Sequence, residues 1–193
     1  MPNKALLSAL LALPLAGCIS LGAEPPEQLL TLTAAQTAPA GSATSGDPAS
    51  ALAVLEPGAD QRLDVTRVPV QVSDSSLAYL KDAVWVDRPA VLFERLLVET
   101  IRARGDRLVV GESDLGYTAA TKLSGQLLDM GYDAASGSVI VRYDAVLQQP
   151  EGQVRTQRFE SRVSDVAADA ASVAPALNQA ANEVAAQVAD WVG

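Results

Sequence analysis

The chain has 193 residues, a net charge of −9, a single cysteine and no histidine. The missing histidine excludes imidazole-based catalytic triads and His-ligated zinc or haem, and one cysteine excludes internal disulfides, Cys-rich zinc sites and iron–sulfur clusters. Because nucleic-acid affinity rests on clustered Lys and Arg, the acidic balance excludes a nucleic-acid partner, and the length with 49% hydrophobic residues predicts one globular domain.

The chain begins with the pattern of a secretory signal. A short positive start ends at Lys4, and an apolar run follows from Ala5 to Leu15. As a helix this run would rise about 16 Å, which is too short for a hydrocarbon core of roughly 30 Å. The run is therefore typical of a signal peptide and not of a membrane span.

The sequence LAGC at residues 15–18 follows this run directly. It resembles the lipobox of bacterial lipoproteins at each of its four positions, which implies cleavage before Cys18 and acylation of the Cys18 sulfur. Residues 1–17 are then a lipoprotein signal peptide, and the covalent acyl chains on Cys18 are the only attached group expected, with no cofactor. Two or three acyl chains anchor a protein stably, whereas one binds reversibly. The alternative is a free cysteine in an ordinary signal peptide.

The residues after Cys18 bear on where the lipoprotein resides. Ile19 stands where an Asp would retain a lipoprotein in the inner membrane of enteric-type bacteria. We therefore expect a lipid-anchored protein of the outer membrane that faces the periplasm of a Gram-negative bacterium. Residues 18–28, with Pro25 and Pro26, are predicted to form a lipidated tether that reaches at most about 35 Å. Residues 29–193 are predicted to be a single domain.

Strands and one long loop are predicted for the first part of this domain. Leu29–Thr33 is predicted to be a short strand. Residues 34–50 are rich in Ala, Ser, Thr, Gly and Pro, and they are predicted to be a flexible loop because they cannot bury enough apolar area to offset their ordering entropy. Pro69 cannot donate to a sheet ladder, so its strand lies at an edge or at a bulge. The further strands predicted here are Ala51–Glu56, Leu63–Val72 and Leu77–Val86.

A helix is predicted between Asp87 and Gly105. Asp87 can cap it, Pro89 fits its first turn, and Gly105 ends it. Arg95 and Glu99 lie four residues apart on a charged face, which predicts a solvated surface with a weak ion pair; a partner-binding face is the alternative. The apolar residues recur at helical spacing at Phe93, Leu96, Leu97, Thr100 and Ile101.

Three long strands are predicted in the second half of the domain. Residues 133–137 and 149–152 carry the residues that tight turns need, so consecutive strands are expected to pair as antiparallel hairpins. In the middle strand every second residue from 139 to 147 is apolar, so one face meets the core. The strands are Thr121–Tyr132, Ser138–Gln148 and Val154–Val163, and a short strand over Arg107–Val110 precedes them.

The last predicted element is a helix from about Asp169 to Val192. Its many alanines allow a close approach to the sheet. Pro175 requires either a start near Ser172 or an earlier start with the proline inside the helix. The predicted fold is α+β, a two-layer sandwich in which two helices pack on one face of a mostly antiparallel or mixed sheet of about six strands.

No catalytic or metal site is expected, and the chain is predicted not to be an enzyme. The carboxylates are scattered through turns and helix surfaces without a D-x-D-x-D-G loop. Lys81 and Lys122 lack a serine at the S-x-x-K spacing, and residues 111–116 (GESDLG) lack the GK[ST] ending of a phosphate loop.

The largest side chains and one arginine pair are the remaining candidate residues. A ligand platform is the alternative for the two tryptophans, which are expected to be core residues. On the last predicted strand, Arg158 and Arg162 share a face and are a candidate partner surface, whereas Arg155 points to the opposite face. The candidate structural anchors are Tyr79, Trp85, Pro89 and Trp191.

Two stretches resemble one lipoprotein family. AVWVDRPAVLFERLL at Ala83–Leu97 resembles that family's W-a-x-x-P-x-x-L-L entry to a helix, and ALNQAANEVAAQVADWV at Ala176–Val192 is similar to its A-L-x-x-A terminal helix. With the lipobox, the chain resembles the ABC-type transport auxiliary lipoproteins, which accompany mammalian-cell-entry (MCE) transporters and include the lipoprotein of the paraquat-inducible operon. The resemblance covers roughly Ser50–Val192, and the chain departs from the family in its long loop and in a first strand without the usual Tyr.

The resemblance implies a non-enzymatic, lipid-anchored periplasmic component of an MCE-type ABC transporter that moves phospholipid or other hydrophobic molecules between the two membranes. The lipoprotein would dock the MCE assembly at the outer membrane. Its partners would be that membrane, an MCE-domain protein and the ABC permease and ATPase. Whether the protein also forms a homo-oligomer is left open. Two alternatives remain: a lipoprotein whose sandwich carries lipid, and a structural lipoprotein of an outer-membrane assembly or export machine.

Overall fold

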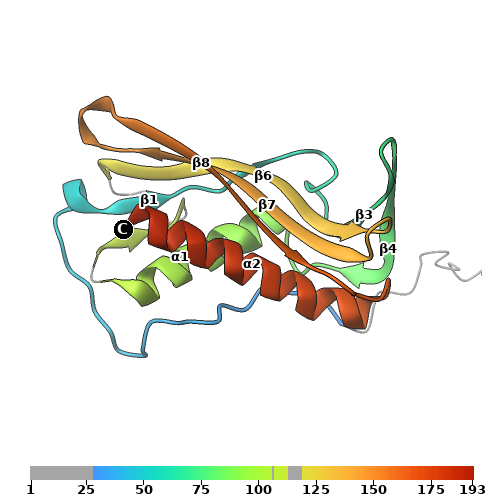
Figure 1. The fold of residues 1–193 in the computed structure, drawn as a ribbon. Helices are drawn as coiled ribbons and strands as arrows, with labels where there is room; N and C mark the ends of the chain where they lie inside the picture. The colour runs from blue at the N-terminus through green and yellow to red at the C-terminus, as the bar shows by residue number, and fades with distance from the viewer. Residues whose placement is uncertain (1–27, 106, 113–118) are drawn as a thin grey trace, which may run out of the picture.

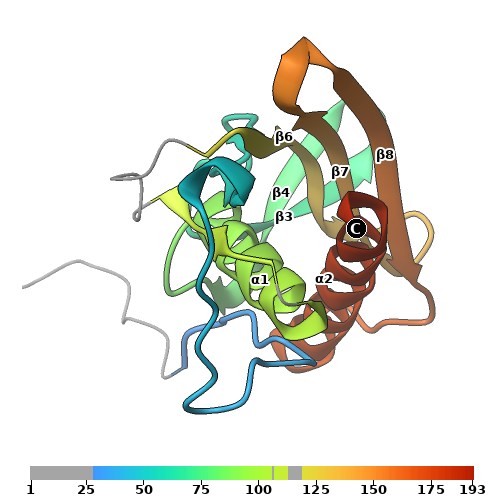
Figure 2. The ribbon, with the colours of Figure 1, turned by 90° about the vertical axis from the view of Figure 1, so that its left-hand side faces the viewer.

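The computed structural model describes residues 28–105, 107–112 and 119–193. They form two layers, a mixed eight-stranded sheet and two helices that pack together on one of its faces (Figures 1 and 2). The α+β prediction is confirmed, and the strand count exceeds six partly because two strands have only two residues each. The elements are β1 (Leu52–Val54), β2 (Gly58–Ala59), β3 (Arg67–Ser73), β4 (Ser76–Val84), α1 (Pro89–Arg104), β5 (Val109–Val110), β6 (Thr121–Asp133), β7 (Ser138–Gln148), β8 (Val154–Val163) and α2 (Ala170–Val192).

The thirteen-residue strand β6 organises the sheet. It pairs in parallel with β1, β2 and β3, and antiparallel with β7. The strands β6, β7 and β8 form two consecutive antiparallel hairpins, as the turn residues predict. The pairs β3–β4 and β1–β5, antiparallel and parallel respectively, extend the sheet on its other side. The sheet is therefore mixed.

Pro69 lies at a bulge and not on an edge strand. Strand β3 lies between β4 and β6, so it is not an edge strand. The register of β3 on β4 shifts between Arg67 and Pro69, and this irregularity accommodates a residue that cannot donate. Gly131 of β6 lies against this point, because a Cβ there would come within 2.5 Å of the Pro69 carbonyl oxygen. The predicted strand start at Leu63 is wrong, since residues 61–66 form turns and bends and β3 begins at Arg67.

The helix α1 begins and ends close to its predicted bounds, but its cap differs. Arg88 is the N-cap residue, and no side chain of the described residues caps the helix; the Asp87 carboxylate accepts a hydrogen bond from the Arg88 N–H instead. The predicted Arg95–Glu99 pair is also wrong, because Arg95 lies 3.3 Å from Asp87 and Glu99 accepts from the backbone of another segment. All five residues of the predicted apolar face are buried.

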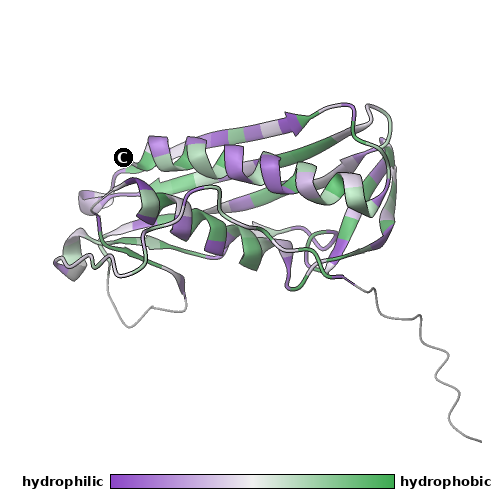
Figure 3. Cartoon of the chain, turned by 90° about the horizontal axis from the view of Figure 1, so that it is seen from below, coloured by the Kyte–Doolittle hydropathy of each residue, from purple (hydrophilic) through white to green (hydrophobic). Residues whose placement is uncertain are grey.

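The helix α2 is capped by Asp169, where the predicted helix begins; the Asp169 carboxylate accepts a hydrogen bond from the Ser172 N–H at 2.9 Å. The helix starts at Ala170, which is the earlier of the two predicted starts. Pro175 therefore lies inside the helix. Both helices carry alternating hydrophilic and hydrophobic bands (Figure 3). Buried alanines such as Ala180 and Ala181 let α2 approach the sheet closely, and it covers β7 and β8.

Residues 28–50, here called the strap, run across both helices on the side away from the sheet (Figures 2 and 3). The predicted strand at Leu29–Thr33 is wrong, since the segment makes only an isolated bridge between Leu30 and Trp85. Its backbone bonds to helix side chains instead: Asn182 accepts from the Ala35 N–H and donates to the Thr33 carbonyl. The loop predicted at 34–50 contains one short 3-10 turn, and its flexibility stays a prediction.

The predicted signal peptide (1–17), Cys18 and residues 19–27 of the tether lie outside the described residues. Within the part of the chain that the structure describes, neither helix is long and apolar enough to cross a membrane.

Candidate functional site

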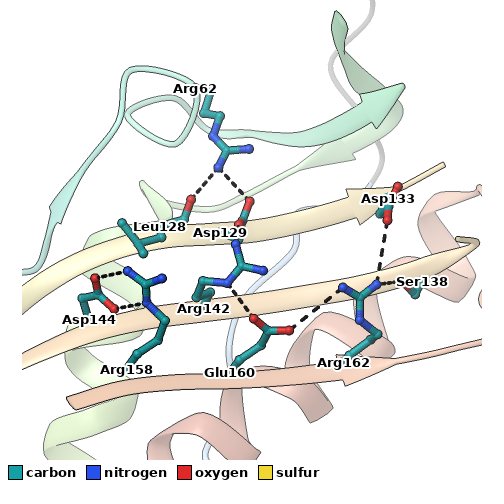
Figure 4. A network of polar contacts seen from close by, with 10 residues as sticks. All are labelled: Arg62, Leu128, Asp129, Asp133, Ser138, Arg142, Asp144, Arg158, Glu160 and Arg162. Carbon is teal, nitrogen blue, oxygen red and sulfur yellow. Dashed lines mark hydrogen bonds and ion pairs between the residues drawn. The ribbon is translucent and has the colours of Figure 1, made fainter. Parts of the chain in front are cut away.

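The candidate site is the face of β6, β7 and β8 that is turned away from the helices, here called the outer face. Alternation along β8 places Phe159 and Ser161 in the interior and exposes Arg158 and Arg162 on the outer face. Arg155 points to the helix side as predicted, where its guanidinium lies 5.0 Å from the centre of the Trp191 ring. The structure thus brings the two predicted arginines together on one polar surface (Figure 4).

Arg158 is held by a neighbouring strand. Its Nε and Nη2 atoms donate to the two carboxylate oxygens of Asp144 on β7, each at 2.6 Å. This two-point contact stabilises the charged forms of both groups. It therefore lowers the pKa of Asp144 below its ordinary value and raises the pKa of Arg158. The pair is exposed, so it fixes the orientation of Arg158 more than it stabilises the fold.

Arg162 lies at the other end of the same strand. It donates to the Ser138 hydroxyl at 2.8 Å and lies 3.8 Å from the Asp133 carboxylate and 4.0 Å from that of Glu160. The pKa of Asp133 is lowered, first by a hydrogen bond from the Ser136 hydroxyl and in part by the charge of Arg162. The turn between β6 and β7 thus fixes this arginine.

Asp129 of β6 links two arginines at the centre of the outer face. Its two oxygens accept from Arg62 and Arg142, both at 2.7 Å, and Arg142 also donates to Glu160 at 2.6 Å. The β6–β7 register shifts between Leu127 and Asp129, and the carbonyl of Leu128 at this bulge accepts a second bond from Arg62 at 2.5 Å. The charged network of Figure 4 therefore has four arginines and four carboxylates; six of these residues are linked to one another, and Arg158 and Asp144 form a separate pair beside them.

A shallow groove of about 830 Å³ continues the outer face toward the far end of the β7–β8 hairpin. Gly125 forms part of its floor, and a Cβ there would overlap the Asp144 carbonyl oxygen and the Tyr143 ring. The Tyr143 hydroxyl donates to the Ser124 carbonyl at 2.7 Å, and burial raises the pKa of this phenol. Arg158 and Asp144 line the groove, so the groove and the charged network share one border.

The four candidate anchors lie away from the outer face. Trp85 is 2% exposed and Pro89 is buried at the start of α1, so Trp85 cannot offer a ring to a ligand. Trp191 is partly buried and packs edge-on against Phe159 with ring centres 5.6 Å apart. Tyr79 is half-buried, with the Arg67 guanidinium 4.5 Å from its ring centre. Their surroundings are those of packing residues.

Comparison with known proteins identifies the family. The family model described as "ABC-type transport auxiliary lipoprotein component" matches residues 30–189. The chain belongs to this family. No curated protein matches the chain.

Two solved structures with TM-scores above 0.5 support the fold of this auxiliary lipoprotein. Protein XCC0632 from Xanthomonas campestris, of the family DUF330, has a TM-score of 0.72 at 19% identity and covers 86% of this chain and 94% of its own. An uncharacterized protein has a TM-score of 0.62 at 15% identity, over 75% and 93% of the two chains. A PelC dodecamer from Paraburkholderia phytofirmans has a TM-score of 0.41 at 15% identity, over 76% and 91%.

Sequence reasoning missed the acidic partners and the bridging role of Asp129. Alternation along β7 places Arg142 and Asp144 on the polar face, but their partners depend on the register of three strands and on the bulge at residue 128. Among the described residues no group of three or more Cys, Asp or Glu side chains could hold a metal ion. The outer face therefore presents a polar surface on which the arginine and carboxylate charges balance.

Proposed function

We propose that this protein is a lipid-anchored periplasmic component of an MCE-type ABC transporter, and that it docks the MCE assembly at the outer membrane. The transporter would move phospholipid or other hydrophobic molecules between the two membranes. The observation that carries the proposal is the family match over residues 30–189 behind a lipobox ending at Cys18. The domain acts by being held in place and bound, without catalysis.

The position of the strap supports this role. Its hydrogen bonds to Asn178, Asn182 and Glu99 hold it on the helices, so the tether predicted for residues 18–28 would alone set the distance between Cys18 and the domain. Ten extended residues reach at most about 35 Å, which confines the domain to a thin layer next to the bilayer. Confinement raises the local concentration of the domain for any partner that reaches this layer, so a modest affinity of the domain for that partner is enough.

The lipid-carrying alternative is less well supported by the packing. A carrier needs an apolar space inside the sandwich, but the layer between sheet and helices holds large side chains such as Trp85, Phe93 and Tyr143, which are at most 2% exposed. The groove of about 830 Å³ lies outside this layer, on the outer face, where it is open to solvent. Docking by the surface fits these features better than enclosure of a lipid.

Two substitutions near the lipobox test the anchor. Cys18→Ala removes the acylation site, and we expect it to abolish transport in a strain that lacks the wild-type gene while the domain stays folded. Ile19→Asp is the matched control, since it leaves the acylation site and is expected to keep the lipoprotein in the inner membrane. Both should fail if docking at the outer membrane is required. Full transport by either variant would contradict the proposal.

Isolation of the lipidated protein from membranes separates the alternatives. We expect an MCE-domain protein to be retained with it. Retention of an outer-membrane barrel instead would favour a structural component of an export or assembly machine. Lipid retained by the purified domain in native mass spectrometry would favour a carrier.

A further inference from the structure

Exposed apolar side chains gather at one end of the domain. Among the described residues, the large apolar side chains that are exposed are those of Leu29, Val72, Leu77, Val86 and Val154. Val72 and Leu77 lie in the β3–β4 hairpin, and Leu29 and Val86 lie beside the end of β4. Figure 1 shows β3 and β4 at the opposite end of the domain from the C-terminus. Single exposed apolar residues are ordinary, whereas a group of them marks a contact site.

Leu29 and Val86 lie on two segments that are hydrogen-bonded to each other. The Leu30 N–H donates to the Val84 carbonyl at 2.7 Å, and the Val86 N–H donates to the Leu30 carbonyl at 2.8 Å. Leu30 packs against the core, and Trp85 is buried. Alternation therefore turns Leu29 and Val86 outward, where each is 53% exposed. The two side chains lie at the point where the predicted tether joins the domain.

The side of the β3–β4 hairpin that is turned away from the core continues this apolar surface. In the register of β3 on β4, Val84 lies opposite Arg67 and Leu77 lies opposite Gln71. Arg67 and Gln71 alternate along β3 with Val68, which is fully buried, so Val84 and Leu77 also face away from the core. The surface, here called the hairpin face, is made up of Leu29, Leu77, Val84 and Val86.

The hairpin region does not share the acidic excess of the chain. Residues 67–88 carry three basic and three acidic side chains, a net charge of zero in a chain of net charge −9. The Lys81 side chain is 91% exposed, and its Nζ atom lies 3.9 Å from the Asp82 carboxylate. A long cationic side chain can place its charge among lipid headgroups while its stem lies on apolar surface. The charges of these residues therefore do not oppose contact with anionic headgroups.

We propose that the hairpin face lies on the surface of the membrane that anchors the lipoprotein, with its apolar side chains between the lipid headgroups. Leu29 follows Cys18 by only eleven residues, so acyl chains on Cys18 would keep Leu29 within roughly 40 Å of the bilayer. At this distance the effective concentration of lipid is high, and contact by a few side chains is enough.

The proposal rests on the proposed function, because the lipid anchor brings the domain to the membrane. It adds the orientation of the domain on that membrane. The β7–β8 hairpin lies at the other end of the domain (Figure 1). In the proposed orientation this hairpin would point away from the bilayer, where a periplasmic partner can reach it.

A fluorescent probe in the full lipidated chain tests the orientation. Cys18 is the only cysteine and is acylated in this form, so an introduced cysteine is the only free thiol. Val86→Cys labelled with an NBD fluorophore reports on the hairpin face. Val154→Cys is the matched control, because Val154 is 58% exposed and lies at the start of β8. The membrane is supplied as vesicles of phosphatidylethanolamine and phosphatidylglycerol that include lipids with a doxyl quencher on the acyl chain.

We expect the doxyl lipids to quench the probe at position 86 and to leave the probe at position 154 unquenched. Leu29→Ser with Leu77→Ser removes several methylenes from the contact, so the quenched fraction at position 86 should fall about tenfold. Val154→Ser is the control for these substitutions and should leave the quenched fraction unchanged.

Three results would overturn the proposal: no lipid quenching at position 86, equal quenching at both positions, or an unchanged quenched fraction after the two serine substitutions. A blue shift of the probe at position 86 without lipid quenching would also overturn it, because this result would indicate contact with protein. Transport separates this proposal from the docking function. An unquenched probe at position 86, together with loss of transport in Cys18→Ala, would remove the membrane orientation and leave the docking function.

Discussion

The two faces of the same sheet are stabilised in different ways. The helix side is filled by close-packed apolar side chains, which include Phe93 and Tyr143 in edge-to-face contact with ring centres 5.3 Å apart. The outer face of β6, β7 and β8 is instead covered by arginine–carboxylate contacts that remain partly exposed. On the helix side, a substitution is tolerated only if the new side chain fits the volume of the one it replaces. On the outer face, the charges and their geometry set the surface that a partner meets. Substitutions on the two faces should therefore differ in their effects.

The largest loss of stability is expected on the helix side. Phe93 lies fully buried between α1 and the sheet, so Phe93→Ala should lower the free energy of unfolding by about 3–5 kcal/mol. Chemical denaturation of the full chain measures it, with Phe93→Leu as a control that leaves a smaller cavity. A loss below about 1 kcal/mol for Phe93→Ala would show that this layer is not close-packed.

The second-largest loss of stability is expected for a substitution at Gly125, where the two faces of the sheet meet. A Cβ at this position would overlap the Asp144 carbonyl oxygen, so Gly125→Ala must separate β6 from β7 locally. We expect a loss of about 1–3 kcal/mol. Gly46→Ala is the control, because its Cβ would lie 3.7 Å from its nearest neighbours, and its unfolding midpoint should match that of the wild type. Equal stability of both variants would argue against the close approach of the two strands.

A smaller loss is expected in the charged network. Asp129→Ala leaves two arginines without their shared acceptor, and we expect it to cost about 1–2 kcal/mol. Asp144→Ala removes a more exposed carboxylate with a single arginine partner, so it should cost less than about 1 kcal/mol. Thermal unfolding of the two variants side by side measures the difference. The reverse order would mean that Asp129 does not connect the network.

The smallest effect is the pH dependence of the outer face. The pKa of Asp144 lies below its ordinary value of 3.8 because Arg158 binds the carboxylate. A carboxyl group whose pKa is lower in the folded state stabilises the fold above its unfolded pKa, and this contribution is lost as the pH falls below that value. The unfolding midpoint of Asp144→Asn should therefore decline less than that of the wild type between roughly pH 5 and pH 2. Parallel pH profiles would contradict the assignment.

Local patterning was sufficient to predict most of the elements. The bounds of β7 and β8, the buried face of α1 and the approximate bounds of α2 follow from alternation and helical spacing, which depend on residues a few positions apart. The same local reasoning failed at Leu29–Thr33. This segment has strand-like residues, but only Leu30 bridges to Trp85, and the backbone of Thr33 bonds to Asn178 and Asn182, about 145 positions away.

The candidate site was predictable only in part. Alternation placed Arg158 and Arg162 on the same face and Arg155 on the other, and both placements hold in the structure. Their partners could not be predicted, because a shift of one residue in strand register changes every cross-strand pair. The bulge at residue 128 makes such a shift and brings Asp129 opposite Arg142.

Sequence alone was enough to predict the fold class and the family, and residues 15–18 resemble a lipobox, because these features depend on local periodicity and on motifs that are contiguous in the chain. The three-dimensional structure was needed to show that Pro69 lies at a bulge inside the sheet, that the strap lies on the helices, and that the outer-face arginines are paired. These features depend on strand order and register. Both are set by the packing of the whole domain, since the contacts join residues far apart in the chain.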